Sequence, residues 1–182
     1  KSVYMACAEV SGQVLRAMKP GSSSAKAFLQ QMCVELATMF RERQFDRALL
    51  CLDVIADSMP EVADQFFPKI FDALGLLVGE FKLSALSLIE KRAAAIPNLE
   101  QYMRPYLVAL LTQREPKLQL KALLIVKHLV SIRMDASALR ALLDPLSKNF
   151  GPQHISVDCR RAAQEIYILI WENYQDLRES RT

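Results

Sequence analysis

Apolar residues recur along this chain at intervals of three and four positions, which is the spacing of one face of a helix. No stretch alternates apolar and polar residues over the length of a strand, and only five glycines interrupt the pattern. Clusters of proline, glycine and serine separate the periodic segments. Helices are expected at 3–18, 25–43, 45–59, from Pro60, at 81–95, from Pro97, at 117–133, after a cap at Asp135, and from Gly151-Pro152 to Leu177. The sequence therefore predicts an all-α chain of four helix pairs and one unpaired C-terminal helix.

Prolines eight residues apart recur within this helical pattern. The two complete pairs are Pro60 with Pro68 and Pro97 with Pro105, and a third copy has Ser137 with Pro145. The copies are offset by 37 and then 40 residues, which lies within the range of repeats built from two helices. Such repeats pack side by side, so this spacing predicts an α-solenoid.

Apolar positions follow the same register as the prolines. The positions eleven and eight residues before Pro60, Pro97 and Ser137 are apolar in every copy. These positions are Leu49, Leu52, Leu86, Ile89, Val126 and Leu129. Each helix of a stacked repeat must bury one stripe on its mate and another on its neighbour. We therefore expect these six side chains to form the core between repeats.

The second proline of each copy falls inside the expected second helix. A proline at such a position removes one backbone hydrogen bond and bends the helix axis. Pro68, Pro105 and Pro145 are therefore predicted to kink their helices and to set the curve of the stack. The alternative is that each of these prolines marks the true start of its helix, after a loose turn.

Composition favours an intracellular protein with a large core. Hydrophobic residues make up 52% of the chain and charged residues 24%, while the net charge of +3 is too small to indicate a nucleic-acid partner. The four cysteines are scattered and form no Cys-x-x-Cys motif, which is typical of buried thiols in a reducing compartment. The longest apolar runs have six residues, far fewer than the ~20 that span a bilayer, and no signal peptide is visible.

The start of the chain suggests that it belongs to something longer. The first residue is Lys1 and not methionine, and the helical pattern begins almost at once. Residues 1–182 are therefore interpreted as a single segment of a helical-repeat solenoid and as a fragment of a much larger chain.

No motif for catalysis, for a metal or for a cofactor is present. The Gly-rich phosphate-binding loops, the Gly-x-Ser-x-Gly nucleophile motif and the signatures of protein kinases are all missing from the sequence. His128 and His154 are far apart, and no cysteine or histidine cluster accompanies either of them. The sequence therefore predicts a segment that is not an enzyme and that needs no cofactor.

Basic residues form weak clusters that a nucleic acid could contact. One candidate patch combines Lys117 and Lys121 with Arg160 and Arg161, and Arg41, Arg43 and Arg47 gather at an expected turn. Acidic residues nearly balance these cations, and no aromatic residues are interleaved for base stacking. A solvated surface is the favoured interpretation, and direct contact of this segment with DNA is not expected.

Two resemblances extend this interpretation. Val157-Asp158-Cys159-Arg160-Arg161-Ala162-Ala163 resembles the Val-x-x-Arg-x-Ala-Ala signature of HEAT repeats, so the solenoid is expected to be HEAT-like. Longer segments resemble, in order and spacing, the helical-repeat region of the DNA-dependent protein kinase catalytic subunits, which belong to the phosphatidylinositol-3-kinase-related kinases. Those segments are Val3–Arg16, Cys51–Leu74, Leu139–Phe150 and Ile166–Asp176.

The resemblance implies a place in DNA repair. It implies a parent chain that is a giant nuclear serine/threonine kinase, recruited to double-strand breaks by the Ku heterodimer for non-homologous end joining. The kinase domain of that family lies elsewhere, so this segment would be a non-catalytic part of the solenoid ring that surrounds the DNA end and relays conformational change. Its implied partners are the flanking helical repeats of the same chain and, through the parent, Ku and DNA ends, with no membrane.

Two other classes of function stay open at this point. A stand-alone HEAT-type adaptor would grip a partner peptide or helix in its concave groove. A nucleic-acid-binding repeat module would bind duplex DNA with an affinity that falls steeply as salt rises.

Overall fold

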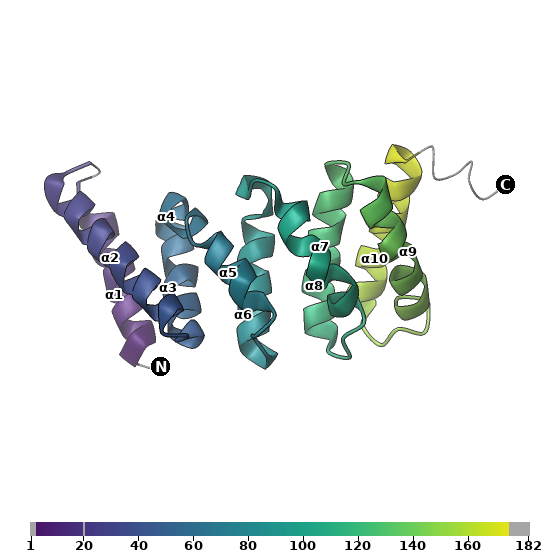
Figure 1. Ribbon diagram of the computed structural model, residues 1–182, viewed down its shortest axis with the longest axis horizontal. Helices are drawn as coiled ribbons and strands as arrows, with labels where there is room; N and C mark the ends of the chain where they lie inside the picture. The colour runs from purple at the N-terminus through teal and green to yellow at the C-terminus, as the bar shows by residue number, and fades with distance from the viewer. Residues whose placement is uncertain (1–2, 20, 175–182) are drawn as a thin grey trace. The chain divides into compact units, whose positions relative to one another are not determined.

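The computed structural model describes residues 3–19 and 21–174, and every regular element in these ranges is a helix (Figure 1). The elements are α1 (Val3–Ala17), α2 (Ser23–Arg41), α3 (Phe45–Ser58), α4 (Pro60–Asp64), α5 (Phe67–Leu74), α6 (Gly79–Lys91), the 3-10 helix η1 (Ala93–Ala95), α7 (Leu99–Leu111), α8 (Pro116–Ser131), α9 (Ala136–Asn149) and α10 (Val157–Asn173). The prediction of an all-α, HEAT-like helical-repeat fold is confirmed. The helices divide between two compact units, Lys1–Leu88 and Ile89–Thr182.

In the first unit, α3 is the helix against which its neighbours pack. It contacts α1, α2 and α4. Leu49, Leu52 and Ile55 lie along its buried side and are at most 2% exposed. From α5, Ile70 and Leu74 add side chains that are 1% exposed. A continuous apolar core therefore forms from helices that are each amphipathic.

The helix expected from Pro60 is in fact two short helices, and the predicted kink at Pro68 is wrong. Pro60 begins α4 as expected, but α4 ends at Asp64, and α5 begins only at Phe67. A proline ring inside a helix clashes with the carbonyl four residues earlier, and the residue four before Pro68 is Asp64. Pro68 instead lies in the first turn of α5, where its missing N–H has no intrahelical partner to lose. At this position the alternative interpretation, a new helix start, is correct.

The other two second prolines lie within continuous helices. Pro105 is inside α7, where it is exposed, and Pro145 is inside α9, where it is buried. The helices that carry them thus tolerate one missing hydrogen bond each. The bend that these prolines impose stays a prediction. Pro97, expected to open α7, lies in the preceding turn, since Asn98 caps the helix in the left-handed region with φ 56°.

In the second unit, α8 is the central helix. It packs against η1, α7 and α10, and α7 also packs against α9 (Figure 1). Buried side chains surround α8 on several sides: Leu118, Gln119, Ala122, Leu123, Ile125, Val126, Leu129 and Val130. Because α8 has so little exposed surface, the stability of the whole unit depends on its side chains.

The six positions expected to form the repeat core are all buried. None of Leu49, Leu52, Leu86, Ile89, Val126 and Leu129 is more than 2% exposed. Burial of this degree is what a core position requires. The contacts that these side chains make from one repeat to the next stay a prediction.

Two helices end at an arginine whose backbone lies in the left-handed region. Arg43 follows α2 with φ 58°, and Arg133 follows α8 with φ 62°. In both cases the N–H of the next residue donates to the carbonyl five residues earlier, at 2.8 and 2.9 Å. This is the hydrogen-bond pattern with which a glycine commonly ends a helix. A side chain at such a position strains the backbone, because its Cβ crowds the chain.

Candidate functional site: polar contacts between successive repeats

The described residues hold no group of three or more histidine, cysteine or acidic side chains that could bind a metal ion. In the same ranges, none of the helices has both the length and the apolarity needed to cross a membrane. The polar side chains of the second unit lie instead where one repeat meets the next. We therefore take these contacts between repeats as the candidate functional site.

The first contact joins α7 to the start of α9. The guanidinium of Arg104 donates to Glu100 at 2.5 Å and to Asp135 at 3.3 Å, and the N–H of Asp135 donates to Glu100 at 3.0 Å. The Asp135 carboxylate also caps α9, since it accepts the N–H of Ala138 at 3.1 Å and the hydroxyl of Ser137. One carboxylate therefore both begins a helix and ties it to the preceding repeat.

Hydrogen bonding lowers the pKa of Asp135. The hydroxyl of Ser137 has the largest effect, followed by the N–H of Ala138, and the charge of Arg104 lowers the pKa further. A carboxyl group whose pKa is lower in the folded state than in the unfolded state stabilises the folded state at pH values above the unfolded-state pKa. This stabilisation is lost as the pH falls through the folded-state pKa.

We expect Asp135→Asn to lower the melting temperature of the second unit at neutral pH, with a difference that shrinks as the pH falls below about 4. Asparagine is also a good N-cap, so the substitution removes the charge and keeps the helix start. Calorimetric melting curves of both forms across this range provide the measurement. A difference that stays constant down to pH ~2 would show that the charge of Asp135 contributes nothing.

The second contact joins the ends of α8 and α10. The Tyr174 hydroxyl donates to the carbonyl of Met134 at 2.9 Å, and the guanidinium of Arg133 donates to the carbonyl of Asn173 at 3.0 Å. Burial raises the pKa of Tyr174, whose side chain keeps its proton for this hydrogen bond. The strained Arg133 thus gains an internal partner one repeat away.

The third contact lies at the opposite ends of the same helices. Gln119 is 6% exposed, and its amide N–H donates to the carbonyl of Leu111 at 3.4 Å. Its amide oxygen is 2.9 Å from Nε2 of His154, and Nδ1 of that ring accepts the N–H of Ser156 at 3.1 Å. Both hydrogen bonds form when the ring proton of His154 is on Nε2, because Nε2–H then donates to the amide oxygen of Gln119 and Nδ1 accepts from Ser156. The buried amide is therefore paired at both ends.

Two further hydrogen bonds support this polar cluster. Asn149, at the end of α9, donates to the same carbonyl of Leu111 at 3.2 Å. The thiol of Cys159 donates to the carbonyl of Pro116 at 3.4 Å, and burial raises the pKa of that thiol. The start of α10 therefore lies beside the start of α8. Since their ends are also joined, α8 and α10 run in the same direction, as equivalent helices of neighbouring repeats do.

The structure uses half of the predicted basic patch for internal contacts. Lys121 forms an ion pair with Glu90 at 2.9 Å. The guanidinium of Arg160 donates to the carbonyl of His154. Lys117 and Arg161 are exposed. Because two of these four cations already hold parts of the chain together, the patch offers less charge to a nucleic acid than the sequence suggested.

The separations of these contacts match the repeat length. Apart from the bond of Gln119 to Leu111, which spans eight positions, the side-chain hydrogen bonds described above between different helices of the second unit join residues 31 to 43 positions apart. An ion pair between Lys127 and Glu165, at 2.6 Å, has a separation of 38. The prolines reveal the repeat offset in the sequence, and polar residues paired at that same offset are the signal that would have identified these contacts.

Comparison with known proteins agrees with the resemblance seen in the sequence. A family model described as "DNA-PKcs, CC5" matches residues 1–182. Among curated relatives, the DNA-dependent protein kinase catalytic subunits of Xenopus laevis, Mus musculus and Gallus gallus are 28%, 27% and 26% identical to this chain. Each match covers 97% of this chain and only 4% of the relative.

The resemblance to the helical-repeat region of these kinase subunits is thereby confirmed, and the matched part is a small fraction of each relative's length. The fold agrees with it, since every regular element of the described residues is a helix. The chain belongs to the DNA-PKcs CC5 family.

Proposed function

We propose that this chain is a non-catalytic scaffold segment of a large nuclear serine/threonine kinase that acts in the repair of DNA double-strand breaks. It would form part of a ring of helical repeats that supports recruitment to DNA ends by the Ku heterodimer and relays conformational change during non-homologous end joining. The observation that carries the proposal is the set of polar contacts at repeat separations, in a chain whose whole length matches the kinase family.

These contacts give the relay a physical basis. A stack of repeats deforms through small adjustments at each interface, because every repeat touches only its neighbours. In the second unit, α8 is tied to α10 at both ends, through Cys159 at the start and Tyr174 at the finish. A shift of one helix therefore moves its equivalent in the next repeat as a body.

The flanking repeats of the longer chain are the proposed direct partners. On α10, Ile168 and Trp171 lie three residues apart and are 56% and 65% exposed. Residues three apart share one face of a helix, so these side chains form an apolar strip on which a following repeat would pack. Direct binding of DNA by this segment is not part of the proposal.

The stand-alone adaptor has less support than the scaffold. A stand-alone adaptor would be a separate protein of about this length. The curated relatives are much longer chains, and the match covers only 4% of each of them. The family match across all 182 residues favours the scaffold.

The scaffold is tested by Ile168→Asp in the full-length kinase. A carboxylate on this face would oppose packing of the next repeat, because a buried unpaired charge is strongly unfavourable. We expect DNA-stimulated kinase activity to fall about five- to ten-fold, a range typical of coupling between distant sites, while activity without DNA stays unchanged. Gln101→Asp adds the same charge at an exposed position of α7, a helix that carries no part of this strip, and should leave both activities unaltered.

The result that opposes the scaffold is full DNA stimulation by the Ile168→Asp protein. Equal loss of activity with and without DNA would also count against a relay, since it would indicate damage to the kinase as a whole.

A further inference from the structure

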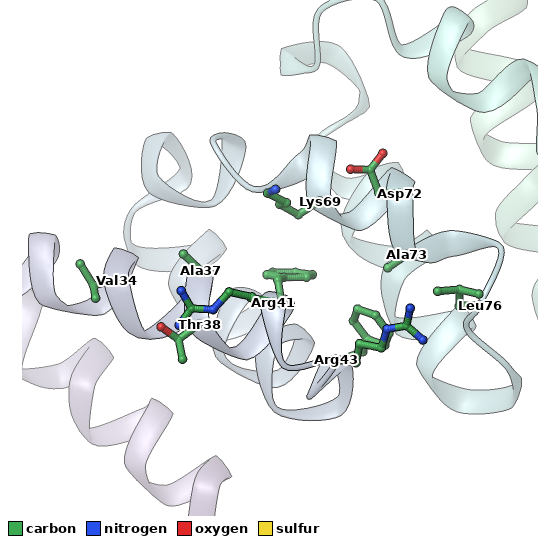
Figure 2. Close-up of a pocket in the computed structure, with 11 residues that line it drawn as sticks. Val34, Ala37, Thr38, Arg41, Arg43, Lys69, Asp72, Ala73 and Leu76 are labelled. Carbon is green, nitrogen blue, oxygen red and sulfur yellow. The ribbon is translucent and has the colours of Figure 1, made fainter.

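A groove in the first unit has no part in the contacts described so far. One wall is the last half of α2, with Val34, Ala37, Thr38 and Arg41 (Figure 2). The other is α5, with Lys69, Asp72 and Ala73, and the turn after it, with Leu76. Both sets follow the three-four-seven spacing of one helix face, and together they line a single hollow of about 600 Å³. A groove between two helices has the form that accepts a peptide or a helix.

The floor of the groove is aromatic and firmly packed. Phe40, which is 7% exposed, stacks on Phe66 with ring centroids 6.0 Å apart and an interplanar angle of 15°. Phe45, which also lines the groove, approaches Phe40 at 6.3 Å in a tilted arrangement. Rings held on several sides keep their positions, so the floor is preformed.

The two walls expose apolar side chains. Val34 is 53% exposed and Leu76 is 60% exposed, one on each wall. A bound apolar side chain would remove both from water and contact the aromatic floor. Burial of this surface would contribute favourably to binding at about 25 cal/mol per Å².

Charge around the groove is predominantly positive. Arg41, Arg43 and Lys69 are exposed there, and Asp72 is the single carboxylate among the lining residues (Figure 2). Within the described part of the chain, none of these three cations forms an ion pair. Their charges are therefore available to carboxylates of a partner.

Arg43 adds a second, independent observation. It has the same strained backbone as Arg133, yet only Arg133 uses its guanidinium inside the fold, in the bond to Asn173. The guanidinium of Arg43 lies instead at the groove. A strained residue persists where something outweighs the strain, and strained positions cluster at sites that bind ligands.

From this geometry we infer that the groove between α2 and α5 binds an acidic peptide segment with one large apolar side chain. The apolar anchor rests on the phenylalanine floor between Val34 and Leu76, and carboxylates on either side pair with Arg41, Arg43 and Lys69. Duplex DNA fits this site less well, because the floor offers no polar partner to a phosphate and Asp72 repels one. The inference does not depend on the scaffold proposal, since all lining residues belong to the first unit.

Arg43→Gly in the full-length protein is the most direct test. Glycine relaxes the left-handed backbone, so this change removes a charge without weakening the fold. The probe is a short fluorescein-labelled peptide with a central tryptophan flanked by glutamates, and its anisotropy reports binding. We expect Arg43→Gly to weaken binding about three- to ten-fold and Leu76→Asp to weaken it at least as much.

Arg133→Gly is the matched control, because it removes the same charge from the same backbone geometry in the other unit. It should leave peptide binding unchanged. A second probe with glutamines in place of glutamates should bind at least about ten-fold more weakly.

Several outcomes would overturn the inference. Equal binding of the glutamine peptide would remove the role of charge, and equal binding by the Arg43→Gly and Leu76→Asp proteins would place the peptide elsewhere. A DNA duplex that binds the full-length protein and loses affinity with Arg43→Gly but not with Leu76→Asp would assign the groove to nucleic acid.

Discussion

Replacing Leu129 with aspartate is expected to unfold the second unit cooperatively. Leu129 is 0% exposed on α8, the helix that contacts η1, α7 and α10. A carboxylate there loses its hydration and finds no cation among the apolar side chains that surround α8, so it either stays charged at great cost or takes up a proton. The expected loss is at least about 4 kcal/mol, which is a large share of the ~5–15 kcal/mol that stabilises a typical domain.

Hydrogen exchange in the full-length protein measures this effect region by region. Amides from α7 to α10 should all lose protection together, since one core connects them. Lys117→Asp provides the control, because it places the same residue at an exposed position near the start of α8, where a negative charge suits the helix dipole. Loss of protection confined to α8, with α7 and α10 intact, would contradict the central role assigned to this helix.

The three proline copies show what the sequence could predict and where it failed. The same eight-residue spacing gave a continuous helix through Pro105 and Pro145 but a break before Pro68. The residue before the proline differs between copies: Arg104 and Asp144 are exposed, whereas Phe67 is 3% exposed. A charged residue there suits the solvent side of an unbroken helix.

The break before Pro68 has a packing reason. Phe66 and Phe67 are consecutive and both buried, and the turn at residues 65–66 directs both rings into the core. A helix continued through residues 65–66 would carry Pro68 in its interior, where the proline ring clashes with the carbonyl of Asp64. The sequence carried this signal, a pair of phenylalanines directly before a proline, but the proline spacing alone could not reveal it.

The left-handed arginines could not be predicted from the sequence. Glycine is the usual sign of a helix end in this conformation, and neither Arg43 nor Arg133 is followed or preceded by one. What holds Arg133 is a carbonyl 40 residues away, at Asn173. Periodicity predicts the faces of single helices, whereas such a contact depends on how the repeats pack.

The buried amide of Gln119 provides the second large effect. Gln119→Met keeps nearly the same side-chain volume and removes the hydrogen bonds to Leu111 and His154. Any loss of stability therefore reports on these hydrogen bonds and not on a cavity. The carbonyl of Leu111 retains Asn149 at 3.2 Å, but Nε2–H of His154 loses its acceptor. An unpaired donor in a partly buried site costs about 1–3 kcal/mol, which is the expected loss in the stability of the second unit.

A double-mutant cycle separates the pairing from other effects. His154→Phe keeps an aromatic ring against Phe150, whose centroid is 5.2 Å from that of the imidazole, and it removes the stranded N–H. The double variant should therefore be more stable than the sum of the single losses predicts, by about 1 kcal/mol. Gln113→Met, at an exposed position of the loop between α7 and α8, controls for the methionine itself. If the two losses simply add, Gln119 and His154 act independently, and the polar link at this end of the repeats does not contribute to their packing.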